Sequence, residues 1–141
     1  MPKLTQLDAP EALVCTMVLV AAADGGMTDR EIGVMAGQVQ TLPAFRDFSS
    51  RALDVATEAA VELLNEEYGL RHAGRLIRAA LSPRLRETAY ALACEVIAAD
   101  DVAGQESLEM LAFVAAELHL DRLVAAAIER GVRARHQAVE D

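Results

Sequence analysis

The sequence predicts an all-α fold, a single bundle of about seven helices in which a helix–acidic turn–helix unit occurs twice about a pseudo-two-fold axis. The first observation is composition: hydrophobic residues make up 53% of the chain, but aromatic residues only 4%. Such sequence, rich in alanine, valine and leucine, favours helices, whereas sandwiches and barrels need more aromatic and β-branched residues in alternation. The second is the helical spacing of apolar residues. The third is length, since 141 residues without a Gly/Ser linker indicate one domain, residues 1–141.

The first unit begins with a helix that we expect from Asp8, whose side chain can cap it, to about Ala23. Pro10 is tolerated in the first turn of a helix. Apolar residues occupy most faces of this helix, so it should be central and buried on most sides. The run Asp24-Gly25-Gly26 is a strong helix stop, which places an acidic turn directly after it.

The second helix of this unit should open at Thr28 and end before Pro43. Thr28 and Glu31 have the spacing of a capping box, in which each side chain accepts a hydrogen bond from the backbone amide of the other residue. The apolar spacing predicts a buried face made of Ile32, Met35, Ala36 and Val39.

Two charged helices are predicted between the units. Ser49 or Ser50 can cap a helix that runs to about Glu66, and a shorter helix follows Gly69. The first carries an acid at every fourth position, and the second carries an arginine stripe. The stripes either pair with each other or present a face to a protein partner, although exposed stripes are usually only solvated. The acids are Asp54, Glu58, Glu62 and Glu66, and the arginines are Arg71, Arg75 and Arg78.

The second unit begins at Ser82-Pro83, a helix-start signal, and its first helix stops at Asp100-Asp101. The next helix begins near Gly104, and a last helix begins near Asp121, whose side chain can cap it. The last helix ends among arginines, which are favourable at a helix C-terminus. The predicted buried positions of the helix after Gly104 are Leu108, Leu111, Ala112, Ala115 and Leu118.

The two units align without a gap at an offset of 76 residues, the separation of Asp24 and Asp100. Ala22-Ala23-Asp24 then lies on Ala98-Ala99-Asp100, and the apolar positions of the following helices coincide. Self-similarity of this kind indicates an internal repeat, and chance similarity between alanine-rich helices is the alternative. The coinciding apolar pairs are Ile32 with Leu108, Met35 with Leu111, Ala36 with Ala112, and Leu42 with Leu118.

The acidic residues of the two units match less well than the apolar ones. Gly25 lies on Asp101, and Glu31 lies on Ser107. Glu106 stands one position before Ser107, and a shift of one residue turns a side chain by about 100° around a helix. Any site built from both turns should therefore be asymmetric, with its stronger half in the first unit.

An apolar helix ending in Ala23-Asp24-Gly25, a short turn, and Glu31 opening the next helix, followed by a second copy, resembles the TerB-like tellurite-resistance family. The resemblance covers roughly Ala12 to Leu120. It implies an all-helical fold of about seven helices and acidic positions that gather into a divalent-metal site. Related domains occur beside membrane-anchored DnaJ-like co-chaperones, and the family name records a phenotype, so it implies a stress-associated role without a mechanism.

Carried over by motif position, the resemblance assigns site roles to Asp24, Gly25 and Glu31, and to Asp100 in the second copy. Asp101 replaces the usual Gly there and Ser107 the usual Glu. The chain therefore departs from the family pattern in its second half-site.

The functional reading of these turns is binding of a divalent cation, because Ca²⁺ and Mg²⁺ prefer several oxygen ligands. Its four candidate ligands are Asp24, Glu31, Asp100 and Glu106. The structural reading is that the acids only cap helices, which suits acids near helix N-termini. A third reading, an enzyme that uses Asp24 and Asp100 as an acid–base pair, requires both carboxylates in one cleft.

Composition excludes other classes of function. A net charge of −9 argues against binding nucleic acid or an anionic membrane surface. No signal-peptide core or membrane-spanning run is present, so we expect a cytoplasmic protein. Cys15 and Cys94 lie in apolar helical runs and are expected to be buried thiols. The scattered histidines and serines match no catalytic or cofactor motif, so we expect a non-enzymatic module that binds a cation, a small ligand or a protein partner.

Overall fold

A computed structural model of the chain describes residues 5–23, 25–99 and 104–139, and these residues form seven α-helices, one short 3₁₀ turn and no strand. The prediction of an all-α bundle of about seven helices is confirmed. Within these residues no helix is both long and apolar enough to cross a membrane. The elements are α1 (Ala9–Ala21), α2 (Asp29–Thr41), η1 (Pro43–Phe45), α3 (Ser50–Leu64), α4 (Gly69–Ala80), α5 (Pro83–Ala98), α6 (Gln105–Glu117) and α7 (Arg122–Arg135).

Side-chain caps define most of the helix starts. Five helices begin at the capping residue that the sequence predicted, and each of these side chains accepts a hydrogen bond from a backbone amide of the first turn. Such a cap stabilises a helix by about 1 kcal/mol. α6 differs, because Gly104 precedes it and provides no side-chain cap. The five capping residues are Asp8, Thr28, Ser49, Ser82 and Asp121.

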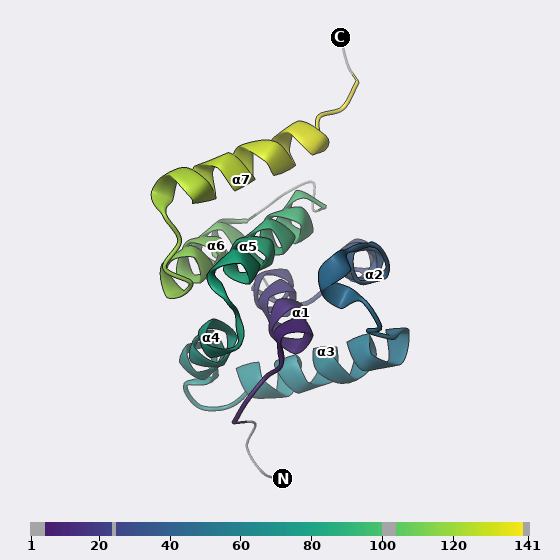
Figure 1. Cartoon of the computed structure of the whole chain (residues 1–141), viewed down its shortest axis with the longest axis vertical. Helices are drawn as coiled ribbons and strands as arrows, with labels where there is room; N and C mark the ends of the chain where they lie inside the picture. The colour runs from purple at the N-terminus through teal and green to yellow at the C-terminus, as the bar shows by residue number, and fades with distance from the viewer. Residues whose placement is uncertain (1–4, 24, 100–103, 140–141) are drawn as a thin grey trace.

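Helix α1 is the centre of the core, as its all-round apolar sequence predicted. Every residue from Ala12 to Ala21 is buried. Figure 1 shows α1 surrounded by the other helices of the bundle, with α3 on one side and α5 on the other. The one buried hydroxyl on α1, that of Thr16, donates to the Ala12 carbonyl over 2.8 Å, so burial leaves no unpaired polar group there.

The buried faces of α2 and α6 agree with the prediction at Met35, Val39 and Leu118, which are buried, and differ from it at three other positions. Ile32 and Leu108, both expected in the core, are 47% and 50% exposed, and Ala112 is also exposed. The preceding residues, Glu31 and Ser107, are buried instead. The prediction for Ile32, Leu108 and Ala112 is therefore wrong. Successive residues of a helix are about 100° apart around its axis, so burial of the residue before Ile32 or Leu108 turns the apolar side chain toward solvent. The small alanines and glycines of α2 and α6 offer little apolar surface that would specify which side faces inward.

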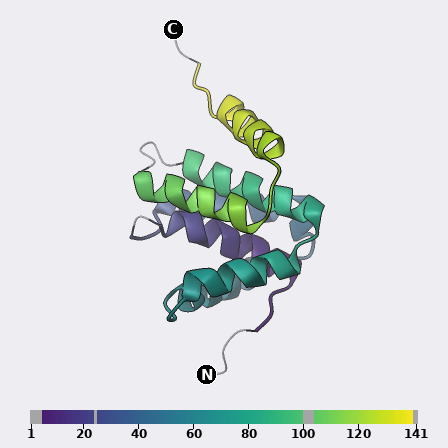
Figure 2. The ribbon, with the colours of Figure 1, turned by 90° about the vertical axis from the view of Figure 1, so that its left-hand side faces the viewer.

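Helix α7 packs on α5, on the side of α5 that faces away from α1 (Figure 1). The turned view shows α7 as the outermost helix at the C-terminal end (Figure 2). His119 makes the turn between α6 and α7 with a left-handed φ of 55°. The amide of Leu120 donates to the Ala115 carbonyl over 3.2 Å, which closes the end of α6 in the manner of a Schellman motif.

The two cysteines are buried and unpaired, as the sequence predicted. Cys15 lies in α1 and Cys94 in α5. Burial raises the pKa of each thiol to about 12, and the nearby carboxylates of Glu129 and Glu95 add to the shift of Cys94. Both thiols are therefore protonated at neutral pH and act as small apolar side chains.

Candidate functional site

Two of the four predicted cation ligands, Glu31 and Glu106, are in the described part of the chain. Asp24 and Asp100 lie outside it. Glu31 and Glu106 stand in the first turns of α2 and α6 respectively. The two glutamates occupy different surroundings.

Glu31 completes the predicted capping box at the start of α2. Its Oε1 atom accepts a hydrogen bond from the Thr28 amide over 2.8 Å, and its own amide donates to the Thr28 hydroxyl over 3.1 Å. The side chain is buried. One carboxylate oxygen is therefore committed to the cap, and Oε2 is the oxygen that can serve another ligand.

Glu106 is exposed, and the buried position of this turn belongs to Ser107. Ser107 is the third residue of α6, as Glu31 is the third residue of α2. The Glu106 carboxylate bends back over the helix start, where its Oε2 atom would lie 3.1 Å from a Cβ atom placed on Gly104. Glu106 therefore lies on the solvent-exposed side of the N-terminus of α6. It does not occupy the buried position that Glu31 has in α2.

The residues that flank the two acidic turns lie side by side. Arg30, in the first turn of α2, donates from Nη1 to the carbonyl of Ala99 over 3.4 Å. Ala99 is the C-terminal cap of α5. The start of α2 and the end of α5 therefore meet at one end of the bundle. Hard divalent cations take several oxygen ligands, so a cation at this end needs more than one carboxylate around it.

Within residues 5–23, 25–99 and 104–139, no three His, Cys, Asp or Glu side chains are grouped so that they could hold a metal ion. The described acids in the first turns of α2 and α6 are Asp29, Glu31 and Glu106. A cation site here consequently requires Asp24, Asp100 or both in addition to Glu31.

The charged stripes of α3 and α4 do not pair with each other among the described residues. Glu66 pairs with His72 over 3.5 Å, and Arg78 reaches Glu117 of α6 over 3.4 Å. The remaining acids of the α3 stripe, Asp54, Glu58 and Glu62, are exposed. Val55 and Val61 are exposed between them, and Val55 is 59% accessible. The outer face of α3 is therefore acidic with apolar residues interspersed.

A groove with a volume of about 810 Å³ lies between α2, α5 and α7. We call it the α2–α7 groove. Its walls are α2 and α7, and α5 lines it between them. The volume is in the range of small-molecule sites, about 300–1,000 Å³. Most of the lining is apolar or small, and the three charged or titratable groups gather at one end. The lining residues are Val34, Gly37, Gln38, Thr41, Leu42, Thr88, Ala91, Leu92, Glu95, Ile128, Gly131, Val132, Arg135 and His136.

Glu95 organises the polar end of the groove. This buried carboxylate in α5 lies 2.8 Å from Nε of Arg135 through Oε1 and 2.7 Å from Nε2 of His136 through Oε2. A buried carboxylate needs such partners. Sequence reasoning missed this cluster, although a lone Glu within the apolar run of α5 was a usable signal. Its partners, Arg135 and His136, are 40 and 41 residues further along the chain, and no local pattern connects them to Glu95.

A second polar contact ties α7 to α5. The Tyr90 hydroxyl donates to Oε2 of Glu129 over 2.5 Å. Burial, together with this hydrogen bond, raises the pKa of Tyr90 far above its usual value. The phenol therefore remains a donor at physiological pH. Tyr90 pairs with Glu129, and Glu95, further along α5, pairs with His136, directly after α7. α5 and α7 therefore run parallel, and the C-termini of both helices lie at the polar end of the groove.

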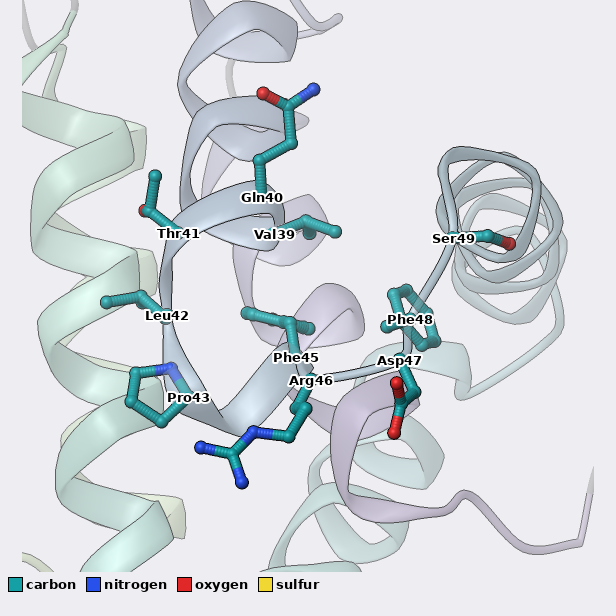
Figure 3. Close-up of a pocket in the computed structure, with 10 residues that line it drawn as sticks. All are labelled: Val39, Gln40, Thr41, Leu42, Pro43, Phe45, Arg46, Asp47, Phe48 and Ser49. Carbon is teal, nitrogen blue, oxygen red and sulfur yellow. The ribbon is translucent and has the colours of Figure 1, made fainter.

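A second hollow of about 580 Å³ lies where the chain passes from α2 through η1 into α3 (Figure 3). Its lining comes entirely from one segment, Val39 to Ser49. The rings of Phe45 and Phe48 lie 5.7 Å apart. Figure 3 shows Gln40 and Arg46 pointing in opposite directions, so polar groups do not converge on the hollow as they do in a binding site.

Comparison with protein-family models, with curated proteins and with solved structures gave no match. The resemblance to the TerB-like family therefore stays a prediction from sequence motifs.

Proposed function

We propose that this chain is a non-enzymatic, TerB-like helical module that binds a divalent cation such as Ca²⁺ or Mg²⁺ where its two acidic turns meet. The observation that carries the proposal is the hydrogen bond from Arg30 to the Ala99 carbonyl, over 3.4 Å, which places the flanks of both turns together. Asp24 and Glu31 from the first turn and Asp100 from the second are the proposed ligands. Glu106, exposed on the solvent side of α6, is the peripheral fourth acid.

The chemistry supports an asymmetric site. Hard divalent cations require several oxygens, and carboxylates are their preferred protein ligands. Glu31 is buried and held by its capping hydrogen bonds, so its free oxygen is preorganised. Ser107 has the corresponding place in α6 and supplies no carboxylate. The net charge of −9 also raises the local cation concentration.

Calorimetric titration with Ca²⁺, Mg²⁺ and Zn²⁺, combined with thermal unfolding, tests this function. A ligand that binds only the folded state stabilises it by about 2.7 kcal/mol at a hundredfold excess over Kd. We expect heat of binding and a raised Tm for Ca²⁺ or Mg²⁺. No heat and an unchanged Tm for all three metals would overturn the cation proposal.

Two variants distinguish ligation from capping. In Glu31→Gln the side-chain oxygen still accepts from the Thr28 amide, so the cap is preserved while the charge is lost. We expect wild-type stability without metal and at least tenfold weaker binding. Asp54→Asn, a matched loss of one acid on the exposed face of α3, is the control and should bind as the wild type does.

The alternative function is a protein-interaction module in which the acidic turns are only caps. The observation that favours it is the outer face of α3, where exposed Val55 and Val61 alternate with Asp54, Glu58 and Glu62. Exposed apolar residues rimmed by charges are typical of partner surfaces, and this surface suits a basic partner. Charge reversal at Glu58 and Glu62 should abolish co-purification of that partner, and Asp24→Ala should not. The opposite pattern would exclude the α3 face.

A further inference from the structure

We infer that the α2–α7 groove binds a small amphiphilic carboxylate, a molecule with a medium-length apolar chain and one acidic head. The lining of the groove includes none of the acidic-turn residues, although its polar end at Glu95 lies one helical turn before the C-terminal cap of α5, Ala99. The inference combines three features of the described residues: an apolar groove of about 810 Å³, small residues on its walls, and a guanidinium at its end.

The body of the groove fits an apolar chain. Leu92 of α5 and Ile128 and Val132 of α7 provide branched apolar contacts. Gly37 of α2 and Gly131 of α7 stand on opposite walls, and a Cβ atom placed on either would meet no heavy atom within 4 Å. The groove therefore has free space beside these two glycines, near the middle of each wall. Along α5, Thr88 and Glu95 are about 10 Å apart at 1.5 Å per residue, so a chain of about eight to ten carbons fits.

The head of the ligand is indicated by the donors at the polar end. Both oxygens of Glu95 are engaged, one by Arg135 and the other by His136. Across the described residues, Glu95 is the one partner of Arg135, and the contact uses only Nε. A guanidinium has five N–H donors, so the two terminal amino groups of Arg135 remain for a further acceptor.

A carboxylate is the acceptor that matches this arrangement. Glu95 engages Arg135 through Nε alone, so the terminal amino groups of the guanidinium are donors that lack an acceptor in the cluster. An arginine fork binds carboxylates in a bidentate manner. The carbonyl end of α7 is partially negative, so recognition of the head depends on the Arg135 side chain, which is 69% exposed and stands at the rim of the groove.

The test uses decanoate, with decanol and decylamine as probes of the same chain length, titrated into the full chain and followed by calorimetry and amide NMR. We expect decanoate to bind more tightly than either of the others by at least tenfold, and to shift the amides of Gly37, Ala91 and Gly131. No binding of decanoate, or equal binding of decylamine, would overturn the inference.

Variants separate the chain from the head. Gly37→Leu and, on the opposite wall, Gly131→Leu should each abolish decanoate binding because leucine fills the groove, and both raise helix propensity, so unfolding is not the cause. Gly33→Leu, the same change on α2 outside the lining, is the control. Arg135→Gln should lower decanoate affinity at least tenfold and leave decanol unchanged. Wild-type affinity in both groove-filling variants would contradict the site.

Discussion

The two helix–turn–helix units, α1–α2 and α5–α6, have second helices of equal length that begin in different ways. α2 and α6 each span 13 residues, but Thr28 and Glu31 close the start of α2 with a reciprocal capping box, whereas Gly104 gives α6 no side-chain cap. The buried third position is a carboxylate in α2 and a hydroxyl in α6. The comparison indicates that apolar spacing builds both units, while polar residues at the turns make them unequal.

The first helices of the two units, α1 and α5, also differ, both in how far they are enclosed and in their polar contacts. α1 is enclosed by the rest of the bundle, and its residues from Ala12 to Ala21 are all buried. α5 faces α1 on one side and α7 on the other. Its outer side carries Tyr90 and Glu95, whose partners are on or directly after α7. α5 therefore makes polar side-chain contacts with another helix, whereas the buried hydroxyl of α1 bonds within its own helix.

The largest expected effect comes from the enclosed helix. Leu13→Ala in α1 removes a fully buried side chain and should lower the free energy of unfolding by about 2–5 kcal/mol. Leu108→Ala in α6, where the side chain is half exposed, should cost less than about 1 kcal/mol. Chemical denaturation of both variants measures the difference, and equal losses would show that the two units share the core evenly.

Each unit holds one buried thiol, and both should make the fold sensitive to alkali. Burial raises the pKa of Cys15 and Cys94 from 9.0 to about 12. The folded state then binds more protons than the unfolded state above pH 9, so stability falls as pH rises from about 9 to 12. The loss approaches about 1.4 kcal/mol per pH unit for each thiol. We would measure the free energy of unfolding by urea denaturation across this pH range. In the double variant Cys15→Ala/Cys94→Ala this free energy should fall less steeply with pH than in the wild type. An equally steep fall in the double variant would show that the thiols are not the cause.

The unequal caps should respond unequally to mutation. Glu31→Ala removes the acceptor for the Thr28 amide and should lower the free energy of unfolding by about 1 kcal/mol. Ser107→Ala, at the same position of α6, makes no cap and should change it by less than about 0.5 kcal/mol. Thermal unfolding of both variants is the measurement. A larger loss in Ser107→Ala would reverse the assignment of the stronger half-site.

The smallest effect concerns the ends of the second helices. α2 ends at Leu42 in an extended conformation, but α6 turns through His119 at a φ of 55°. Glycine adopts this conformation without strain. His119→Gly should therefore raise the free energy of unfolding by about 0.5–1 kcal/mol, less a small loss from the contact of His119 with Arg78 at 3.3 Å. A lower Tm in this variant would mean that the contact outweighs the strain.

Local signals in the sequence predicted the helices well. Side chains such as Asp8, Thr28 and Asp121 act on amides two or three residues away, so the capping pattern specifies each helix start from within one turn. The inward face of α2 was predicted less well, since Ile32 faces solvent and Glu31 does not. Capping hydrogen bonds, which apolar spacing ignores, draw that carboxylate inward.

The candidate sites depend on contacts between distant segments, and these were beyond local patterns. Glu31 was identified because its partner Thr28 is three residues away. Glu95 was missed because Arg135 and His136 meet it only after α7 has folded onto α5. The α2–α7 groove joins three helices, and the open space at Gly37 and Gly131 is a property of their packing.

The most direct test of the account is to locate a paramagnetic cation residue by residue. Mn²⁺ can replace Ca²⁺ or Mg²⁺ at oxygen-rich sites and broadens the amide NMR signals of nearby residues. If the paired turns bind the cation, substoichiometric Mn²⁺ should broaden Gly25, Thr28, Glu31, Ala99 and Gly104 first. First broadening of Asp54, Glu58 and Glu62 on α3, with the turns unaffected, would contradict the proposal and leave the acids of the turns as caps alone.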